Sequence, residues 1–312
     1  MMKIYLVILI IISAKVTAQE AFGINWETIT ANELKIMIDS GLDLDSRDEK
    51  SGLSMTPLMY ACSYSKDYEL TQLLIESGAD IDAQDNRQQT ALMMASGWNN
   101  VPEIVNYLIE SGADVNAKGD LGQTPLMMSS GWNNVPEITM KLVNEGADVN
   151  AIDAQGLNSL ILASRYNRNP EIHEILINAK ADVNHGSDTG WTALNVAIGW
   201  NSLEIVKLLI SSGADVNLQY GNIVSPLIMA ISTNSNLEIY EILINSGADV
   251  NKIGSRNKSP LIMAIRWNSK PEIIQYLIDS GADINYSESE NSLSARELIM
   301  SEERLSAIKI PQ

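Results

Sequence analysis

Residues 90–117 read TALMMASGWNNVPEIVNYLIESGADVNA, and residues 124–151 read TPLMMSSGWNNVPEITMKLVNEGADVNA. In the second stretch, Thr124 can cap a helix that begins at Pro125, and Pro136 can open a second helix. In the first stretch, the apolar residues after the Pro-Glu pair recur at helical spacing, and Gly112 suits the left-handed geometry that ends many helices. Each stretch therefore predicts two short helices followed by a turn-rich loop.

Two motifs recur along the chain with a period of 33 or 34 residues. The first resembles Thr124-Pro125-Leu126 and occurs seven times, while Gly-Ala-Asp occurs six times with Lys180 in place of a seventh glycine. Such a period is typical of a solenoid, in which each repeat packs only on its neighbours. The sequence therefore predicts an all-α solenoid of stacked helix pairs with projecting β-hairpin loops. The glycines of the second motif are Gly78, Gly112, Gly146, Gly213, Gly247 and Gly281.

The tiled pattern Thr-Pro-Leu … Gly-Ala-Asp-Val-Asn-Ala resembles the ankyrin repeat over roughly residues 30–300. The resemblance implies repeats of two antiparallel helices and a hairpin, and a function in binding other proteins. Lys180 departs from the pattern, and it should cost ~1 kcal/mol if the left-handed geometry is kept. We expect residues 19–41 to form an N-terminal capping half-repeat, 42–281 to form seven repeats, and 282–312 to form a C-terminal capping repeat.

The first eighteen residues have the layout of a secretory signal peptide. Lys3 precedes an apolar run at 4–12, and Ala18 ends a small-residue cleavage site. Nine consecutive apolar residues are too few to span a bilayer, which takes ~20. We expect cleavage after Ala18 and a secreted or periplasmic mature chain, with no insertion of that chain into a membrane.

The charge and the scarcity of reactive side chains disfavour nucleic-acid binding and catalysis. The chain has 39 acidic and 21 basic residues, a net charge of −18, which phosphate backbones would repel. It has one cysteine and two histidines, so we interpret Cys62 as an inert packed thiol, His173 as an exposed helical residue and His185 as a loop residue. We predict a monomer with no enzymatic activity, no cofactor and no metal ion.

A short acidic segment resembles a calcium loop only superficially. Asp43, Asp45 and Asp48 lack the glycine at the sixth position and the glutamate at the twelfth that such a loop needs. We interpret the segment as a solvated acidic hairpin.

One feature goes beyond the scaffold: six of the seven repeats have an aromatic residue eight positions after the start of the first motif. The next residue is serine or asparagine, which we expect to end the helix in left-handed geometry, as a glycine would. Tryptophan and tyrosine are enriched at binding hot spots, and the resemblance places this position on the concave face. We predict a protein-binding site made of this aromatic ladder with two loop residues: Tyr64, Trp98, Trp132, Tyr166, Trp200 and Trp267, with Leu121 and Trp191.

Two other interpretations of the ladder remain open. The rings could pack between repeats and serve stacking alone, or a duplication could have copied one tryptophan, since 96–104 and 130–138 are almost identical. Our leading hypothesis is an extracytoplasmic, non-enzymatic scaffold that recognises a protein or peptide with a basic patch on an aromatic-lined acidic concave face. The alternatives are a secreted effector acting on host proteins, an enzyme that uses carboxylates, and a structural envelope component.

Overall fold

The computed structural model describes residues 22–48, 52–200, 202–220, 225–233, 236–254, 257–267, 269–289 and 291–311. The predicted signal peptide lies outside these ranges. The chain divides into two compact units, Met1–Ala154 with Asn178–Lys180, and Gln155–Ile177 with Ala181–Gln312. The described part contains sixteen α-helices, seven pairs flanked by α2 and α17, so an all-α solenoid is confirmed.

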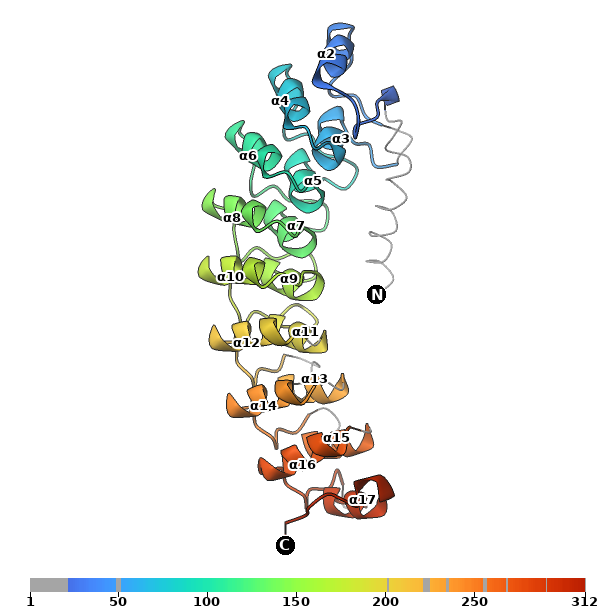
Figure 1. Ribbon diagram of the computed structural model, residues 1–312, viewed down its shortest axis with the longest axis vertical. Coiled ribbons are helices and arrows are strands. Elements are labelled where there is room, and N and C mark those ends of the chain that lie inside the picture. The colour runs from blue at the N-terminus through green and yellow to red at the C-terminus, as the bar shows by residue number, and fades with distance from the viewer. Residues whose placement is uncertain are drawn as a thin grey trace. The chain divides into compact units, whose positions relative to one another are not determined.

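In the first unit the helices form two layers that alternate along the chain (Figure 1). Each helix of a layer contacts the next one in that layer, and the two helices of a repeat contact each other. The first-helix layer consists of α3 (Pro57–Tyr64), α5 (Ala91–Trp98) and α7 (Pro125–Trp132). The second-helix layer consists of α2 (Ala31–Asp39), α4 (Tyr68–Glu76), α6 (Pro102–Glu110) and α8 (Pro136–Asn144).

In the second unit the helices again alternate between two layers (Figure 1). Its first helices are α9 (Ser159–Tyr166), α11 (Ala193–Gly199), α13 (Pro226–Ser232), α15 (Pro260–Arg266) and α17 (Ala295–Ser301), and α17 is followed by the 3-10 helix η3 (Glu303–Leu305). Its second helices are α10 (Pro170–Asn178), α12 (Leu203–Ser211), α14 (Leu237–Asn245) and α16 (Pro271–Asp279).

The helix ends follow the sequence signals. The Thr124 side chain accepts a hydrogen bond from the Met127 backbone N–H, and α7 begins at Pro125 as predicted. All six Gly-Ala-Asp glycines have positive φ, and Lys180 keeps the same left-handed geometry at φ 71°. Lys180 therefore adopts the left-handed geometry for which we expect a cost of ~1 kcal/mol.

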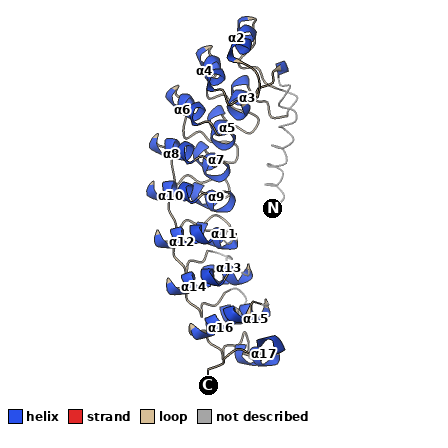
Figure 2. Cartoon of the chain, in the orientation of Figure 1, coloured by secondary structure: helices blue, strands red, loops and turns tan. Residues whose placement is uncertain are grey.

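The loops between repeats are tight turns. The Gly119 N–H donates to the Gln123 carbonyl at 2.9 Å, and the Asp120 N–H donates to Arg87 O of the preceding loop at 2.8 Å. Within the described ranges there is no strand (Figure 2). One isolated antiparallel bridge joins Gly186 and Thr192. The loops therefore close like hairpins but are too short to build a β-ladder before the next helix cap.

Side chains link successive Gly-Ala-Asp-Val-Asn turns. Asn116 accepts from the Asp148 N–H at 2.8 Å through Oδ1, and it donates to Gly146 O at 3.1 Å through Nδ2. Asp82 occupies the same position one repeat earlier and accepts from the Asp114 N–H at 3.1 Å, but a carboxylate has no amide to donate. The same pair of bonds is made by Asn217 and Asn251 in the second unit.

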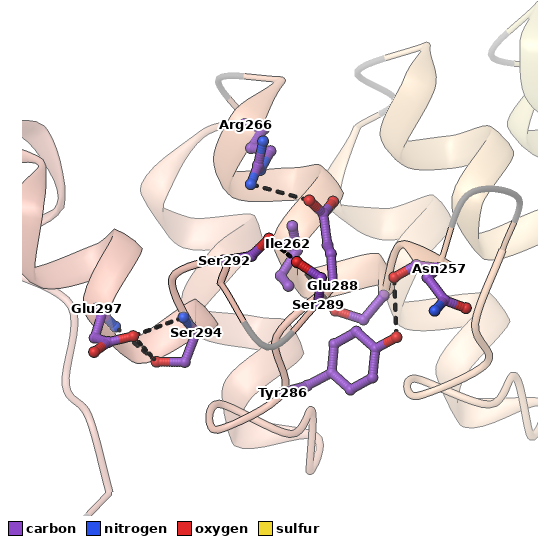
Figure 3. A network of polar contacts seen from close by, with 10 residues as sticks. Asn257, Ile262, Arg266, Tyr286, Glu288, Ser289, Ser292, Ser294 and Glu297 are labelled. Atoms are coloured by element: carbon purple, nitrogen blue, oxygen red, sulfur yellow. Dashed lines mark hydrogen bonds and ion pairs between the residues drawn. The ribbon is translucent and has the colours of Figure 1, made fainter.

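Both ends of the array have extra tethers. At the N-terminal end, Trp26 is buried and stacks on Tyr60, with ring centroids 6.3 Å apart. At the C-terminal end, Glu288 pairs with Arg266 at 3.0 Å, and the Tyr286 hydroxyl donates to Asn257 O at 2.9 Å (Figure 3). These contacts hold the last loop against the end of α15 and against the preceding loop.

Candidate protein-binding surface

In the first unit the ladder residues are the last residues of their helices. Tyr64, Trp98 and Trp132 end α3, α5 and α7, and all three are half-buried. The Trp98 and Trp132 rings contact each other, with centroids 6.2 Å apart and planes inclined at 40°. Tyr64 stacks on Tyr60 at 6.0 Å, and burial, followed by the charge of Glu27, raises the pKa of the Tyr64 hydroxyl.

The residues after these aromatics do not adopt the left-handed geometry that we expected. Asn99 has φ −102° and ψ 136°, and Ser65, Asn133 and Asn167 are likewise extended. The prediction was wrong because the asparagine side chain, and not a left-handed backbone, satisfies polar backbone groups at the helix end. Asn99 Nδ2 donates to Cys62 O at 2.9 Å and to Ser65 O at 2.7 Å, and Oδ1 accepts from the Val101 N–H at 3.0 Å.

Asn133 repeats this bridge one repeat later. Its Nδ2 donates to Ser96 O at 2.9 Å and to Asn99 O at 2.7 Å, while its Oδ1 accepts from the Val135 N–H at 3.0 Å. Each bridge satisfies carbonyls at the end of one first helix from within the next repeat. The bridges therefore fix the backbone that carries Trp98 and Trp132.

In the second unit the ladder is more open. Tyr166 is half-buried and has the Arg165 guanidinium carbon 5.3 Å from its ring centroid. Trp200 and Trp267 follow the last residues of α11 and α15 as C-caps with ψ 4° and 14°, and they are 53% and 46% exposed. At the equivalent position Thr233 is the C-cap of α13. Asn201, Asn234 and Asn268, which follow these residues, lie outside the described ranges.

Loop residues add to the exposed apolar surface. Leu121 is 45% exposed, and Trp191 is half-buried with its backbone N–H donating to Ser187 Oγ at 3.1 Å. Ile152 and Ile253 are also exposed, at 49% and 38%, and the sequence analysis missed them. Each lies two residues after the asparagine of its turn, so an apolar residue at that position was the signal that could have revealed them.

A row of glutamates follows the ladder. In every repeat a glutamate lies in the first turn of the second helix, four or five residues after the ladder position, and it is exposed. The charge is unevenly divided, since residues 19–154 have 22 acidic and seven basic residues and residues 155–312 have 17 and 12. The row consists of Glu69, Glu103, Glu137, Glu171, Glu204, Glu238 and Glu272.

The structure buries two of the side chains that we expected at the surface. His173 is fully buried, so its assignment as an exposed residue was wrong: it lies on the face of α10 that also carries Ile172 and Leu176. Burial lowers the pKa of His173, opposed by the hydrogen bond between Nδ1 and Asn169 O at 3.0 Å. Asp48 is also buried and accepts from the Tyr60 hydroxyl at 2.6 Å, so only part of its acidic hairpin is solvated.

Two other side chains that could be reactive, Cys62 and His185, have environments that indicate structural roles. Cys62 is buried, and burial raises the pKa of its thiol to about 12, so it is packed as expected. His185 lies in a loop with Nε2 2.8 Å from Gly156 O. Among the described residues no group of three or more His, Cys, Asp or Glu side chains is arranged to hold a metal ion. In the same part of the chain, no helix has the length and apolar character needed to span a bilayer.

A family model described as ankyrin repeats (3 copies) matches residues 29–119, 99–186, 126–220 and 221–288. No curated protein matches the chain. The matched residues cover most of the chain and include all seven helix pairs. The chain therefore belongs to the ankyrin-repeat family.

Proposed function

We propose that this protein is an extracytoplasmic, non-enzymatic scaffold that recognises a protein or peptide through its acidic, aromatic-lined face. Ankyrin repeats typically bind protein partners, which is the coarse basis of the proposal. The observation that carries it further is the periodic aromatic ladder, in which Trp200 and Trp267 remain about half exposed. Large exposed indoles at one repeated position favour a binding surface over isolated surface variation.

The chemistry of the face favours a cationic partner. Exposed indoles bury a large area with few torsions, which makes them suitable binding anchors. The glutamate row and the net charge of −18 favour association with a basic patch and accelerate encounter at low salt. The same charge disfavours nucleic acid.

The test uses the mature chain as bait in the native extracytoplasmic fraction and measures the affinity of captured protein. Trp200→Ala with Trp267→Ala should weaken binding by at least ~2 kcal/mol, as expected for hot spots. Met140→Ala with Leu237→Ala removes exposed apolar side chains from second helices and serves as the matched control. Equal affinity of the tryptophan variant and the wild type would exclude Trp200 and Trp267 as binding anchors and would contradict the observation on which the proposal depends.

Export has its own test. We expect N-terminal sequencing of the extracytoplasmic protein to begin at Gln19, because the cleavage site ends at Ala18. An intact Met1 on that material would contradict the proposed processing.

A further inference from the structure

The junction between α9 and α10 carries two arginines without a carboxylate partner. In the second unit the residues that join the first and second helices of each repeat are 165–169, 199–202, 232–236 and 266–270. They include four charged residues, all basic: Arg165, Arg168, Arg266 and Lys270. Arg266 is paired with Glu288 at 3.0 Å, whereas no ion pair to Arg165 or Arg168 occurs among the described residues. The α9–α10 junction therefore leaves two guanidinium groups available to a ligand.

The ring of Tyr166 orients one of these groups. The guanidinium carbon of Arg165 lies 5.3 Å from the ring centroid, within the ~6 Å range of a cation–π contact. A guanidinium group stacked on a ring keeps its N–H edges free, and its planar fork fits the two oxygens of a carboxylate. Arg165 is therefore oriented before a ligand arrives, which reduces the entropy lost on binding.

Side chains also fix the backbone that carries the second arginine. Asn167 is buried and extended, and its Oδ1 accepts a hydrogen bond from the Asn169 N–H at 2.9 Å. The carbonyl oxygen of Asn169 lies 3.0 Å from Nδ1 of the buried His173. Arg168 is exposed between these two asparagines, and its Cα is within ~7 Å of the Tyr166 Cα because only two residues separate them. The two arginines therefore flank Tyr166 along a backbone whose conformation is set by side-chain hydrogen bonds.

Two repeats of the first unit have no charge at these positions. Glycine and asparagine take the places of Arg165 and Arg168 in residues 97–100 and 131–134. Residues 19–154 also have 22 acidic and seven basic residues. The first unit thus attracts basic groups, whereas the α9–α10 junction presents a local cationic surface that attracts acidic ones.

We infer that the α9–α10 junction binds an acidic segment of the protein partner, with one carboxylate held by Arg165 and a neighbouring carboxylate attracted by Arg168. The inference rests on the proposed function, because it adds an acidic segment to the same partner beside its basic patch. Hydrogen bonds between guanidinium and carboxylate groups are stronger than those to neutral amides, so the junction selects acidic side chains over amides. A partner with one basic and one acidic segment would bind in a single direction, because the reverse direction brings like charges together.

The test compares two synthetic peptides on the wild-type mature chain by fluorescence anisotropy at ~0.15 M salt, where long-range repulsion is screened. One peptide has three glutamates separated by single serines, and the other has glutamine in place of each glutamate. Because the chain has a net charge of −18, nonspecific electrostatics favours the glutamine peptide. We expect the glutamate peptide to bind about tenfold more tightly. Equal or weaker binding of the glutamate peptide would overturn the inference.

Charge variants locate the binding on the folded protein. Arg165→Gln with Arg168→Gln should weaken the glutamate peptide about tenfold and leave the glutamine peptide unchanged. Lys35→Gln with Lys118→Gln removes two exposed positive charges outside the junctions and is the matched control. Both pairs change the net charge equally, so equal losses in the two pairs would overturn the inference.

The two proposals fail in different ways. If the glutamate peptide is not favoured but the captured protein still depends on Trp200 and Trp267, the acidic segment is excluded and the scaffold function stands. If the glutamate peptide is favoured but the captured protein is unaffected by the tryptophan substitutions, the proposed function fails and the acid-binding junction stands.

Discussion

The first helices of this chain end in two ways. In α5 and α7 the tryptophan is the last helical residue, and the asparagine after it is extended and buried. In α11 and α15 the helix ends one residue earlier, and Trp200 and Trp267 lie outside it as exposed C-caps. The same Trp-Asn pair in the sequence thus occurs in two geometries. In one the indole is packed and half-buried, and in the other it is exposed to solvent.

The hydrogen bonds after the aromatic explain part of the difference. Asn99 bonds backward to two carbonyls of the preceding repeat and forward to the start of α6, which holds its backbone extended. After α11 the Ser202 N–H instead donates to Ala197 O, five residues earlier, at 3.0 Å. This bond is typical of a Schellman-type helix C-terminus. The loop after Trp200 is also one residue shorter, which produces the single 33-residue spacing.

The largest effect should come from removing a bridge. Asn99→Ala loses three hydrogen bonds and leaves buried carbonyls without that donor, so it should destabilise the protein by about 3 kcal/mol. Urea unfolding measures the change, and Asn100→Ala at the exposed neighbouring position is the control. A loss no larger than that of the control would mean that the bridge does not hold the first kind of helix end.

Truncating the packed indole and truncating the exposed indole should change the stability of the protein by different amounts. Trp132→Ala removes a half-buried ring in contact with Trp98 and should cost about 2 kcal/mol. Trp200→Ala removes an exposed ring and should stay within about 0.5 kcal/mol of the wild type. Similar thermal unfolding losses in the two variants would remove the distinction between packed and presented rings.

His173 is buried in α10, and its lowered pKa predicts that the stability of the protein depends on pH. Its pKa is lowered by burial, so the unfolded chain binds the proton more readily and stability is lost as pH falls below the unfolded pKa of ~6.5. Val105 and Val206 occupy this position in α6 and α12. The stability of His173→Val relative to wild type should therefore rise by up to about 1.4 kcal/mol for each pH unit below that point.

Chemical unfolding of the wild type and the valine variant at neutral and mildly acidic pH measures this difference. Parallel pH profiles of the two proteins would show that His173 is not the group responsible.

The turn that follows α10 has Lys180 where the other repeats have glycine, and a substitution there tests the cost of this difference. Lys180→Gly should stabilise the protein by about 1 kcal/mol, because glycine adopts the left-handed geometry without a Cβ penalty. Gly146→Ala is the reverse test, since its φ is 86° and a Cβ there would meet open space. Thermal unfolding should move in opposite directions for the two variants, and a shift in the same direction would refute the backbone argument.

The smallest effect concerns the early turns, where aspartate replaces the linking asparagine. Asp82→Asn gains an amide that can donate to Gly112 O, as Asn116 does to Gly146 O, and should add about 0.5 kcal/mol. Asn116→Asp should lose a similar amount in the same urea titration. A stabilising Asn116→Asp would contradict the assigned role of the amide.

Local signals were sufficient for the fold. Thr124, Pro125 and Gly146 act on backbone groups within a few residues, so their roles could be predicted from neighbours in the sequence. The role of Asn99 could not, because its acceptors lie 34 and 37 residues away. His173 was misassigned because histidine is polar and the position is set by packing of α10.

For the candidate site, too, some properties could be predicted from the sequence and others could not. The repeat position of the aromatics was predictable from counting, and the residues that carry it were all identified. Their exposure was not predictable from the shared Trp-Asn pair, because Trp132 and Trp200 differ in the length and the hydrogen bonds of the loop that follows them. The assignment of the whole ladder, together with Leu121 and Trp191, to a binding site stays a prediction.

The asparagine links between turns have a consequence for how the chain is made. Asn116 reaches Gly146 and Asp148, 30 and 32 residues onward, and Asn217 and Asn251 reach equally far. Every such link can form as soon as about one more repeat has emerged, with no need for the distant end of the polypeptide. Contacts this local favour rapid folding. A chain that emerges N-terminus first from a ribosome or a translocation channel can therefore assemble its structure in step with its release.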